Sequence, residues 1–296
     1  MNLRSLKKRA SYFLWALGKS LRADTSCPSC SNKATSLVKR KWLVTVLYRC
    51  PACHLLFRVP KDNLRSSTVF YQENYEEGFT TRMPLPGELE LLLRWGFEGH
   101  EKDFRPYIDV LKAIGLKDGS LIFDYGASWG YGSWQLQKAG FKTIGHEIDP
   151  VRARYASSQL GVPMLADPKA LPGPVDCFFS AHVIEHLPNP NILWETGVAS
   201  LKRGGWLVAF MPNGDLFQAS AAGGAARYHK LWGQAHPMLI TPAYLRSAAR
   251  KYGFDARVYS APYALEVISR GSELVAIDGW ELCVIAQRRN LYVEKP

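Results

Sequence analysis

The sequence has no long hydrophobic run and shows no sign of a secretory signal. None of its apolar stretches reaches the roughly 18 uninterrupted residues of a membrane-spanning helix, so we expect no such helix. The apolar segment at residues 11–17 is followed by Lys19 and Arg22, without the small-residue cleavage site of a signal peptide. These absences lead us to expect a cytoplasmic protein that is not secreted.

Acidic residues are scarce in the first quarter of the chain. Residues 1–65 hold 14 Lys and Arg but only Asp24 and Asp62, a net charge of +12, whereas the remaining residues hold 23 basic against 24 acidic side chains. A basic module joined to a neutral remainder indicates attraction to an anionic partner, such as a nucleic acid, an acidic membrane surface or a phosphate-bearing substrate. The alternative is a solubilising or partner-docking surface.

Residues 1–22 combine basic side chains with apolar ones at helical spacing, and they therefore predict a basic amphipathic helix. Such a helix can lie at the headgroup boundary of a membrane, which would make the protein peripheral at the inner membrane surface. Helices of this kind more often pack on their own protein, and both interpretations stay open.

Cysteine is also rare, but four of the six cysteines form two C-x-x-C pairs: Cys27, Cys30, Cys50 and Cys53. Each pair places two thiolates on one tight turn, and two such turns facing each other form the tetrahedral shell that zinc favours. Because four thiolates leave no open coordination position, we expect a structural zinc ion in a zinc ribbon over residues 23–60. Two disulfides are the alternative, although nothing else indicates an oxidising compartment. The remaining cysteines, Cys177 and Cys283, are expected in the core.

Residues 121–140 have the pattern of a strand, a glycine-rich loop and a helix. The strand ends near Asp124, and the three glycines that follow let the main chain approach a ligand above the strand's carboxyl end. A dinucleotide-binding fold would favour G-x-G-x-x-G, whereas an acid ahead of the glycines suits a positively charged ligand. A second strand within residues 141–149 ends in Glu147, which is placed to accept hydrogen bonds from a ribose diol.

Strands and helices alternate from a helix at residues 101–114 onward, which predicts a doubly wound α/β fold with a mostly parallel sheet. Residues 212–240 interrupt this rhythm after the fifth strand. Because ligands bind outside the carboxyl ends of parallel strands, this insertion should lie over the reacting centre and determine acceptor specificity. Residues 61–99 are expected to connect the ribbon to this domain and to cover its cleft.

Separated segments of this domain resemble, in order, the motifs of the class I S-adenosylmethionine (SAM)-dependent methyltransferases, and the resemblance covers residues 100–290. Residues 124–130 resemble D-x-G-x-G-x-G, with Ser128 in place of the middle glycine. Residues 176–187 resemble the fourth-strand signature that ends in Glu-His. Residues 201–213 are similar to the L-K-P-G-G turn and the fifth strand.

The resemblance implies a seven-stranded sheet with an antiparallel last strand, and SAM as the methyl donor. It assigns cofactor binding to the residues at the matching positions: Asp124, Gly126, Ser128, Gly130, Glu147, Asp167 and His182. In this assignment Glu147 is the ribose-binding acid and Asp167 lies in the segment that contacts adenine. His182 lies at the end of the fourth strand, near the methionine part of the cofactor.

The ribbon and the segment after it also resemble the front end of bacterial methyltransferases that modify sugars and surface polysaccharides. This resemblance implies a sugar, a nucleotide sugar or a related small polar acceptor in glycan or glycolipid assembly. The sugar C-methyltransferases among them carry Tyr-His-Glu-His, whereas this chain has Tyr and His at 228 and 229 followed by Lys230 and Leu231. Because the Glu-His pair is missing, we favour oxygen over carbon as the methylated atom.

Methyl transfer from a sulfonium is an in-line displacement, in which the protein aligns donor and acceptor and helps the acceptor to lose its proton. A histidine with an ordinary pKa of about 6.5 can accept that proton at neutral pH. His236 in the insertion is the first candidate for this catalytic base, and Tyr228 and His229 are the second. Glu185 and His186 are expected to hold the loop and the helix that follows. For each histidine a structural role is equally open.

Two other functions stay open. A basic zinc ribbon ahead of a SAM domain also resembles some ribosomal RNA methyltransferases, and phosphate contacts would explain the charge of the N-terminal module. Against this, the fourth strand ends in Ser-Ala-His and lacks the Asn/Asp-Pro-Pro-Tyr motif of exocyclic amine methylation. The second alternative is a non-catalytic adaptor that keeps the fold as a scaffold, and the nearly complete cofactor motifs argue against it.

Overall fold

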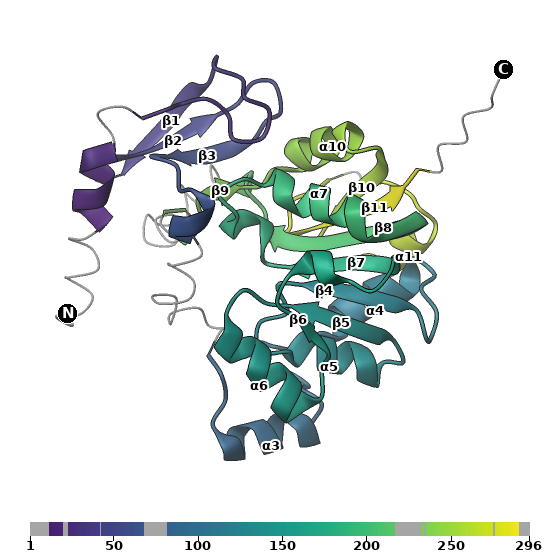
Figure 1. The fold of residues 1–296 in the computed structure, drawn as a ribbon. Helices are drawn as coiled ribbons and strands as arrows, with labels where there is room; N and C mark the ends of the chain where they lie inside the picture. The colour runs from purple at the N-terminus through teal and green to yellow at the C-terminus, as the bar shows by residue number, and fades with distance from the viewer. Residues whose placement is uncertain are drawn as a thin grey trace.

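The computed structural model describes residues 12–19, 23–41, 43–67, 82–216, 232–233, 235–274 and 276–289. These residues form a four-stranded sheet, built mainly from the N-terminal part, and a seven-stranded sheet built from the rest of the chain (Figure 1).

The small sheet is an antiparallel ribbon. Its strands lie in the order β1 (Ser36–Lys41), β2 (Thr45–Arg49), β3 (Leu56–Val59) and β9 (Met238–Leu239). One cysteine turn precedes β1, and the other joins β2 to β3. Strand β9 comes from the insertion at residues 212–240 and pairs with β3, where Leu56 lies opposite Leu239. The insertion is therefore anchored on the ribbon, a connection that the sequence did not predict.

Residues 12–19 form a helix that packs on this ribbon. The hydroxyl groups of Tyr12 and Thr45 are hydrogen-bonded at 3.1 Å, and Arg58 Nη1 donates to the Tyr12 hydroxyl at 2.9 Å. Arg58 is fully buried and forms an ion pair with Asp62. The inner side of the predicted amphipathic helix thus packs on its own protein. None of the helices in the described part of the chain has the length and apolar character needed to cross a bilayer.

The large sheet confirms the predicted doubly wound α/β fold. Its strands are β4 (Leu121–Tyr125), β5 (Lys142–His146), β6 (Met164–Leu165), β7 (Val175–Ala181), β8 (Leu201–Pro212), β10 (Phe254–Ser260) and β11 (Glu281–Arg288). They lie in the order β10-β11-β8-β7-β4-β5-β6, and all are parallel except β11, which runs antiparallel to both of its neighbours.

Helices cover both faces of this sheet (Figure 1). They are α3 (Pro86–Arg94), α4 (Arg105–Ala113), α5 (Tyr131–Lys138), α6 (Pro150–Leu160), α7 (Asn191–Ser200), α10 (Pro242–Lys251) and α11 (Leu265–Ser269), with short 3₁₀ turns η1 (Pro168–Ala170) and η2 (Ile184–His186). On the α7 and α10 face, Trp194 lies in one hydrophobic cluster with Phe178. On the α4 and α11 face, Val110 shares a cluster with Cys177 and Cys283, which are core residues as expected.

The ribbon is docked directly on the large sheet's helices. Ser29 Oγ, in the first cysteine turn, donates to Asn191 Oδ1 at the start of α7 at 2.8 Å, and Asn191 Nδ2 donates to the Ser29 carbonyl at 2.8 Å. Lys251 Nζ donates to the same carbonyl at 3.1 Å, and Thr241 Oγ1 donates to the His54 carbonyl at 3.2 Å. The cysteine turns and the α7 and α10 face share one hydrophobic cluster. The two sheets therefore bury a continuous core.

Candidate active site

The loop between β4 and α5 has the backbone of a ligand-binding glycine loop. Gly126, Ser128 and Gly130 all have positive φ angles, of 88°, 51° and 85°. A Cβ on Gly126 would lie 2.3 Å from Val183 Cγ2, so only glycine fits there. Ser128 adopts the left-handed conformation, which glycine takes without strain, at a cost of about 1–2 kcal/mol.

Glu147 follows β5 and faces this loop. Its Oε2 accepts a hydrogen bond from Ser128 N at 3.0 Å, and its Oε1 accepts one from Asp149 N at 2.9 Å. The Ser128 hydroxyl is buried and has no hydrogen-bond partner among the described residues. A half-buried carboxylate beside an unsatisfied hydroxyl fits the ribose of a nucleoside cofactor, because both groups gain hydrogen bonds from a diol.

Asp124 lies beneath the loop and is buried. It accepts a hydrogen bond from Ser133 Oγ at 2.6 Å, which ties the end of β4 to α5. Burial raises the pKa of Asp124 to about 7, against the Ser133 hydrogen bond, which lowers it. Asp167 is exposed, and its Oδ1 accepts from Lys169 N at 2.9 Å as the cap of η1. Cofactor contacts by either aspartate remain predictions.

His182 lies directly after β7, in a left-handed conformation with a φ of 55°. Its Nε2 is 2.7 Å from Glu281 Oε2, at the start of β11. The Tyr107 hydroxyl donates to the same oxygen at 2.8 Å, and the Tyr263 hydroxyl donates to Glu281 Oε1 at 2.5 Å. Glu281 is only 2% exposed. These four side chains form the polar cluster, in which a single buried carboxylate accepts three hydrogen bonds.

The charge of His182 decides what it can do. Burial lowers its pKa, but the carboxylates of Glu185 and Glu281 outweigh burial and raise it to about 10. His182 is therefore a cation at neutral pH, which does not suit a catalytic base, and its role in cofactor binding stays a prediction. Two carboxylates around one imidazolium leave a net negative charge, which favours a positively charged sulfonium nearby.

A second group of side chains joins η2 to the insertion. The rings of His186 and His236 have centroids 4.6 Å apart. His186 Nδ1 donates to the Ala235 carbonyl at 2.8 Å, and its Nε2 is 4.0 Å from Glu185 Oε1. Burial lowers the pKa of His186 to about 4, so its ring is neutral at neutral pH. The structure thus places His236, the predicted base, next to His186, at the end of the fourth-strand signature.

The four paired cysteines lie together as the spacing predicts. The Sγ atoms of Cys27 and Cys53 are 3.5 Å apart, those of Cys30 and Cys50 are 3.4 Å apart, and all four lie within 4.8 Å of one another. None of them is disulfide-bonded. Four thiolates bound to one zinc ion at about 2.3 Å would be separated by about 3.8 Å. The donor set therefore fits a tetrahedral zinc ion.

Comparisons with known proteins agree with this geometry. A family model described as a methyltransferase domain matches residues 100–258. The chain belongs to the SAM-dependent methyltransferase family. No curated protein matches it in sequence.

Solved methyltransferase structures share the fold of this chain. The plantazolicin methyltransferase BpumL in complex with S-adenosylhomocysteine (SAH) is 12% identical to this chain in sequence. The aligned region covers 76% of this chain and 95% of the BpumL chain, with a TM-score of 0.51. The magnesium protoporphyrin IX methyltransferase ChlM of Synechocystis PCC 6803, also with SAH, is 15% identical in sequence. The aligned region covers 76% of this chain and 100% of the ChlM chain, with a TM-score of 0.52. At these identities the likeness concerns the fold alone.

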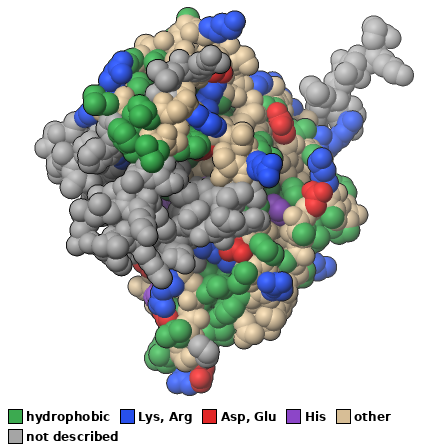
Figure 2. Space-filling model, turned by 60° about the vertical axis from the view of Figure 1, so that its left-hand side comes forward, with side chains coloured by type: hydrophobic (Ala, Val, Ile, Leu, Met, Phe, Trp, Pro, Cys, Tyr) green, Lys and Arg blue, Asp and Glu red, His purple; other side chains and the backbone are tan. Residues whose placement is uncertain are grey.

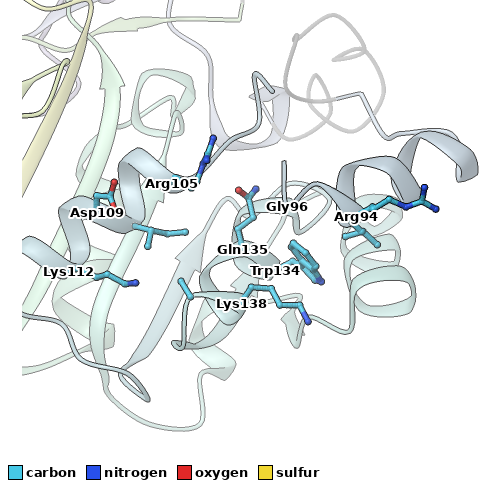
Figure 3. A pocket seen from close by; sticks show the side chains of 11 residues that line it. Arg94, Gly96, Arg105, Asp109, Lys112, Trp134, Gln135 and Lys138 are labelled. Carbon is cyan, nitrogen blue, oxygen red and sulfur yellow. The ribbon is translucent and has the colours of Figure 1, made fainter. Parts of the chain in front are cut away.

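The methyltransferase also has a surface hollow of about 590 Å³ between α3, α4 and α5 (Figure 3). Its wall includes Arg94, Arg105, Lys112 and Lys138 together with Asp109. Two of these cations are already paired, Arg94 with Glu90 and Arg105 with Asp103. The hollow is lined by the carboxyl end of α5, whereas the glycine loop precedes the amino end of this helix, so the hollow is separate from that loop.

Sequence reasoning missed three members of the polar cluster, Tyr107, Tyr263 and Glu281. They come from α4, from the turn after β10 and from β11, and no local motif marks them. The only signal was the acidic residue that opens the otherwise apolar run of β11. Of the predicted acceptor-side residues, Tyr228 and His229 lie outside the described residues.

Proposed function

We propose that this methyltransferase transfers the methyl group of SAM to a hydroxyl oxygen of a sugar or a related small polar acceptor in glycan or glycolipid assembly. The observation that carries the proposal is the polar cluster, in which Glu281 is bonded to His182, Tyr107 and Tyr263 beside the carboxyl end of β7. A site that selects a hydroxyl-bearing substrate needs hydrogen-bond donors and acceptors at fixed positions, because the substrate exchanges its hydrogen bonds to water for hydrogen bonds to the protein.

The roles of the loop residues follow from their positions. Gly126, Ser128 and Gly130 would lie against the cofactor, and Glu147 would accept hydrogen bonds from its ribose. SAM supplies an electrophilic methyl group on a positively charged sulfur. The two carboxylates of Glu185 and Glu281 around the imidazolium of His182 favour this sulfonium. An acceptor hydroxyl aligned with the sulfonium attacks the methyl carbon in line. In this proposal His236 accepts the hydroxyl proton.

The N-terminal module would hold the acceptor's carrier or a membrane surface near the site. We propose that zinc in the four-cysteine centre keeps this module folded. On the outer side of the helix at residues 12–19, Phe13, Leu14 and Leu17 are 41%, 66% and 45% exposed. An apolar outer side next to basic residues suits the headgroup region of a membrane, where glycolipid intermediates reside.

RNA is the second candidate acceptor, because the N-terminal quarter carries a charge of +12. On the face shown in Figure 2, however, the described Lys and Arg side chains form separate spots among hydrophobic and acidic ones. The buried Arg58 forms an ion pair with Asp62, and the half-buried Lys61 forms one with Asp24. Part of the basic charge therefore stabilises the module itself, and a sugar acceptor is favoured.

The test is methyl transfer from SAM that carries a deuterated methyl group. The protein is incubated with nucleotide sugars, glycan fragments and total RNA in separate reactions, and each product is examined by mass spectrometry. We expect the mass increase of a deuterated methyl group on a sugar hydroxyl. Label in RNA with none in any sugar would overturn the proposal and favour the nucleic-acid alternative.

A further inference from the structure

We propose that Glu185, His186 and His236 form a second metal site, which binds one divalent transition-metal ion on the acceptor side of the cofactor loop. One ligand atom from each of these residues lies within 4.8 Å of the others. Two imidazoles and one carboxylate suit zinc, iron, cobalt or manganese. The site is distinct from the four-cysteine centre, which contains only thiolates.

The spacing of the ligand atoms fits a shared ion better than direct bonding. His186 Nε2 and Glu185 Oε1 are 4.0 Å apart, which is too far for a hydrogen bond. Two atoms bound to one ion at about 2.0–2.2 Å are separated by roughly 3–4 Å. The rings of His186 and His236, with centroids 4.6 Å apart, are close enough to share the same ion.

The orientation of His186 is the one that a metal ligand needs. Its Nδ1 donates to the Ala235 carbonyl at 2.8 Å, so the lone pair lies on Nε2, on the side of Glu185. Metal-binding histidines usually donate their other ring N–H to a carbonyl or carboxylate in this way. Ala235 directly precedes His236, so this one hydrogen bond orders two of the three ligands.

Glu185 supplies the observation that points to a bound cation. It is only 3% exposed, and its Oε2 atom has no hydrogen-bond partner in the part of the chain that the structure describes. A buried carboxylate oxygen without a partner is unfavourable, whereas an ion held by both oxygens of the carboxylate satisfies it. The second oxygen, Oε1, is 4.0 Å from His186 Nε2 and 3.5 Å from His182 Nδ1, which links the metal site to the polar cluster.

Three protein ligands leave coordination positions open, as in catalytic metal sites. Glu185 and His186 follow β7, and Val183, two residues before Glu185, lies against the glycine loop at Gly126. An acceptor hydroxyl bound to the ion would release its proton to water more readily. The O–CH₃ bond then forms as the S–CH₃ bond breaks, and the electron pair of that bond stays on the sulfur of SAH. This role rests on the proposed function, and it makes His236 a metal ligand in place of the base.

The test measures metal binding by the full chain with zinc retained in the ribbon. Co²⁺ is added, and bound metal is measured by equilibrium dialysis together with the visible d–d absorption. Co²⁺ binds sites of nitrogen and oxygen ligands more tightly than Mn²⁺ or Fe²⁺ does. We expect one additional equivalent without the thiolate charge-transfer band that exchange into the four-cysteine centre would produce.

Variants of the proposed ligands test which residues bind the Co²⁺ ion. Glu185→Gln and His236→Asn should each weaken Co²⁺ binding at least tenfold, whereas His100→Asn, outside the cluster, should bind like the wild type. SAH affinity and zinc content, measured on the same samples, show that each variant is folded. Wild-type protein that binds no additional Co²⁺ at millimolar concentration, or variants that bind it equally well, would overturn the metal site. Co²⁺ binding with no methylation of any hydroxyl would leave the site standing and refute the acceptor proposal instead.

Discussion

Replacing Glu281 with glutamine tests whether the polar cluster is held by a buried charge. The substitution keeps the side-chain shape and one acceptor oxygen, but it removes the charge that faces His182 at 2.7 Å. Tyr107 and Tyr263 also lose a charged acceptor, and hydrogen bonds to charged groups contribute about 1.5–3 kcal/mol each. Glu185 would then be the one carboxylate among the described residues that is still paired with the imidazolium of His182.

The expected magnitude follows from the burial of Glu281, which is 2% exposed, whereas the His182 side chain is 35% exposed and can be solvated. The loss is therefore that of a hydrogen bond to a charged group, about 1.5–3 kcal/mol, and not the full penalty of a buried ion pair. For a domain of roughly 150–250 residues, each kcal/mol lowers the melting temperature by about 2–4 °C. Glu281→Gln should therefore lower the Tm by about 3–12 °C. The matched control is Glu266→Gln, whose partner Arg270 is exposed, and it should change the stability by less than about 0.5 kcal/mol.

The assay is unfolding at two pH values, by heat for the Tm and by denaturant for the midpoint. Because the pKa of His182 is raised to about 10, the stability from its pairing is complete below its unfolded pKa of about 6.5 and is lost as the pH rises through 10. The destabilisation by Glu281→Gln should thus be larger at pH 7 than at pH 10.5. An equal effect at both pH values, or a Tm loss below about 2 °C, would refute the reasoning.

Three further predictions concern the other sites. Cys50→Ser should abolish bound zinc, measured by elemental mass spectrometry, whereas Cys177→Ala should retain it; zinc in both would refute the four-cysteine centre. Glu147→Ala should weaken SAH binding about 10- to 150-fold by calorimetry, from the loss of about 1.5–3 kcal/mol of hydrogen bonding to a charge, and an unchanged Kd would remove Glu147 from the site. Gly126→Ala should destabilise the protein by more than about 2 kcal/mol through its positive φ and the clash with Val183. A second change, Val183→Ala, should restore part of this loss, and no restoration would count against the steric explanation.

The features that the sequence predicted are those whose geometry is local. The two C-x-x-C turns and the glycine loop are each formed by a few consecutive residues, so residue order alone dictates their backbone. The strand and helix alternation likewise predicted the seven-stranded sheet, because right-handed crossovers leave few ways to arrange such elements. The position of Glu147 directly after the second strand of the large sheet was predicted for the same reason, since it follows from the alternation.

The features that the sequence missed join distant segments. Tyr107 and Glu281 lie on elements at opposite ends of the methyltransferase domain, and their meeting depends on α4 packing against the face that carries β11. The pairing of β9 with β3 was equally invisible, because a two-residue strand has almost no sequence signal. The sequence named both His236 and His186, but it did not predict that their rings would lie side by side. That contact depends on how the insertion packs against η2.

What the sequence by itself determined is therefore the family, the fold, the backbone of the glycine loop and the grouping of the four cysteines. These depend on hydrophobic periodicity and on turns, which act over short stretches of chain. What only the tertiary structure decided is which distant side chains meet: the pairing of His182 with Glu281, the burial of Glu281 and the grouping of Glu185 with His186 and His236. Those properties arise from desolvation and from pairing between segments that only packing brings together.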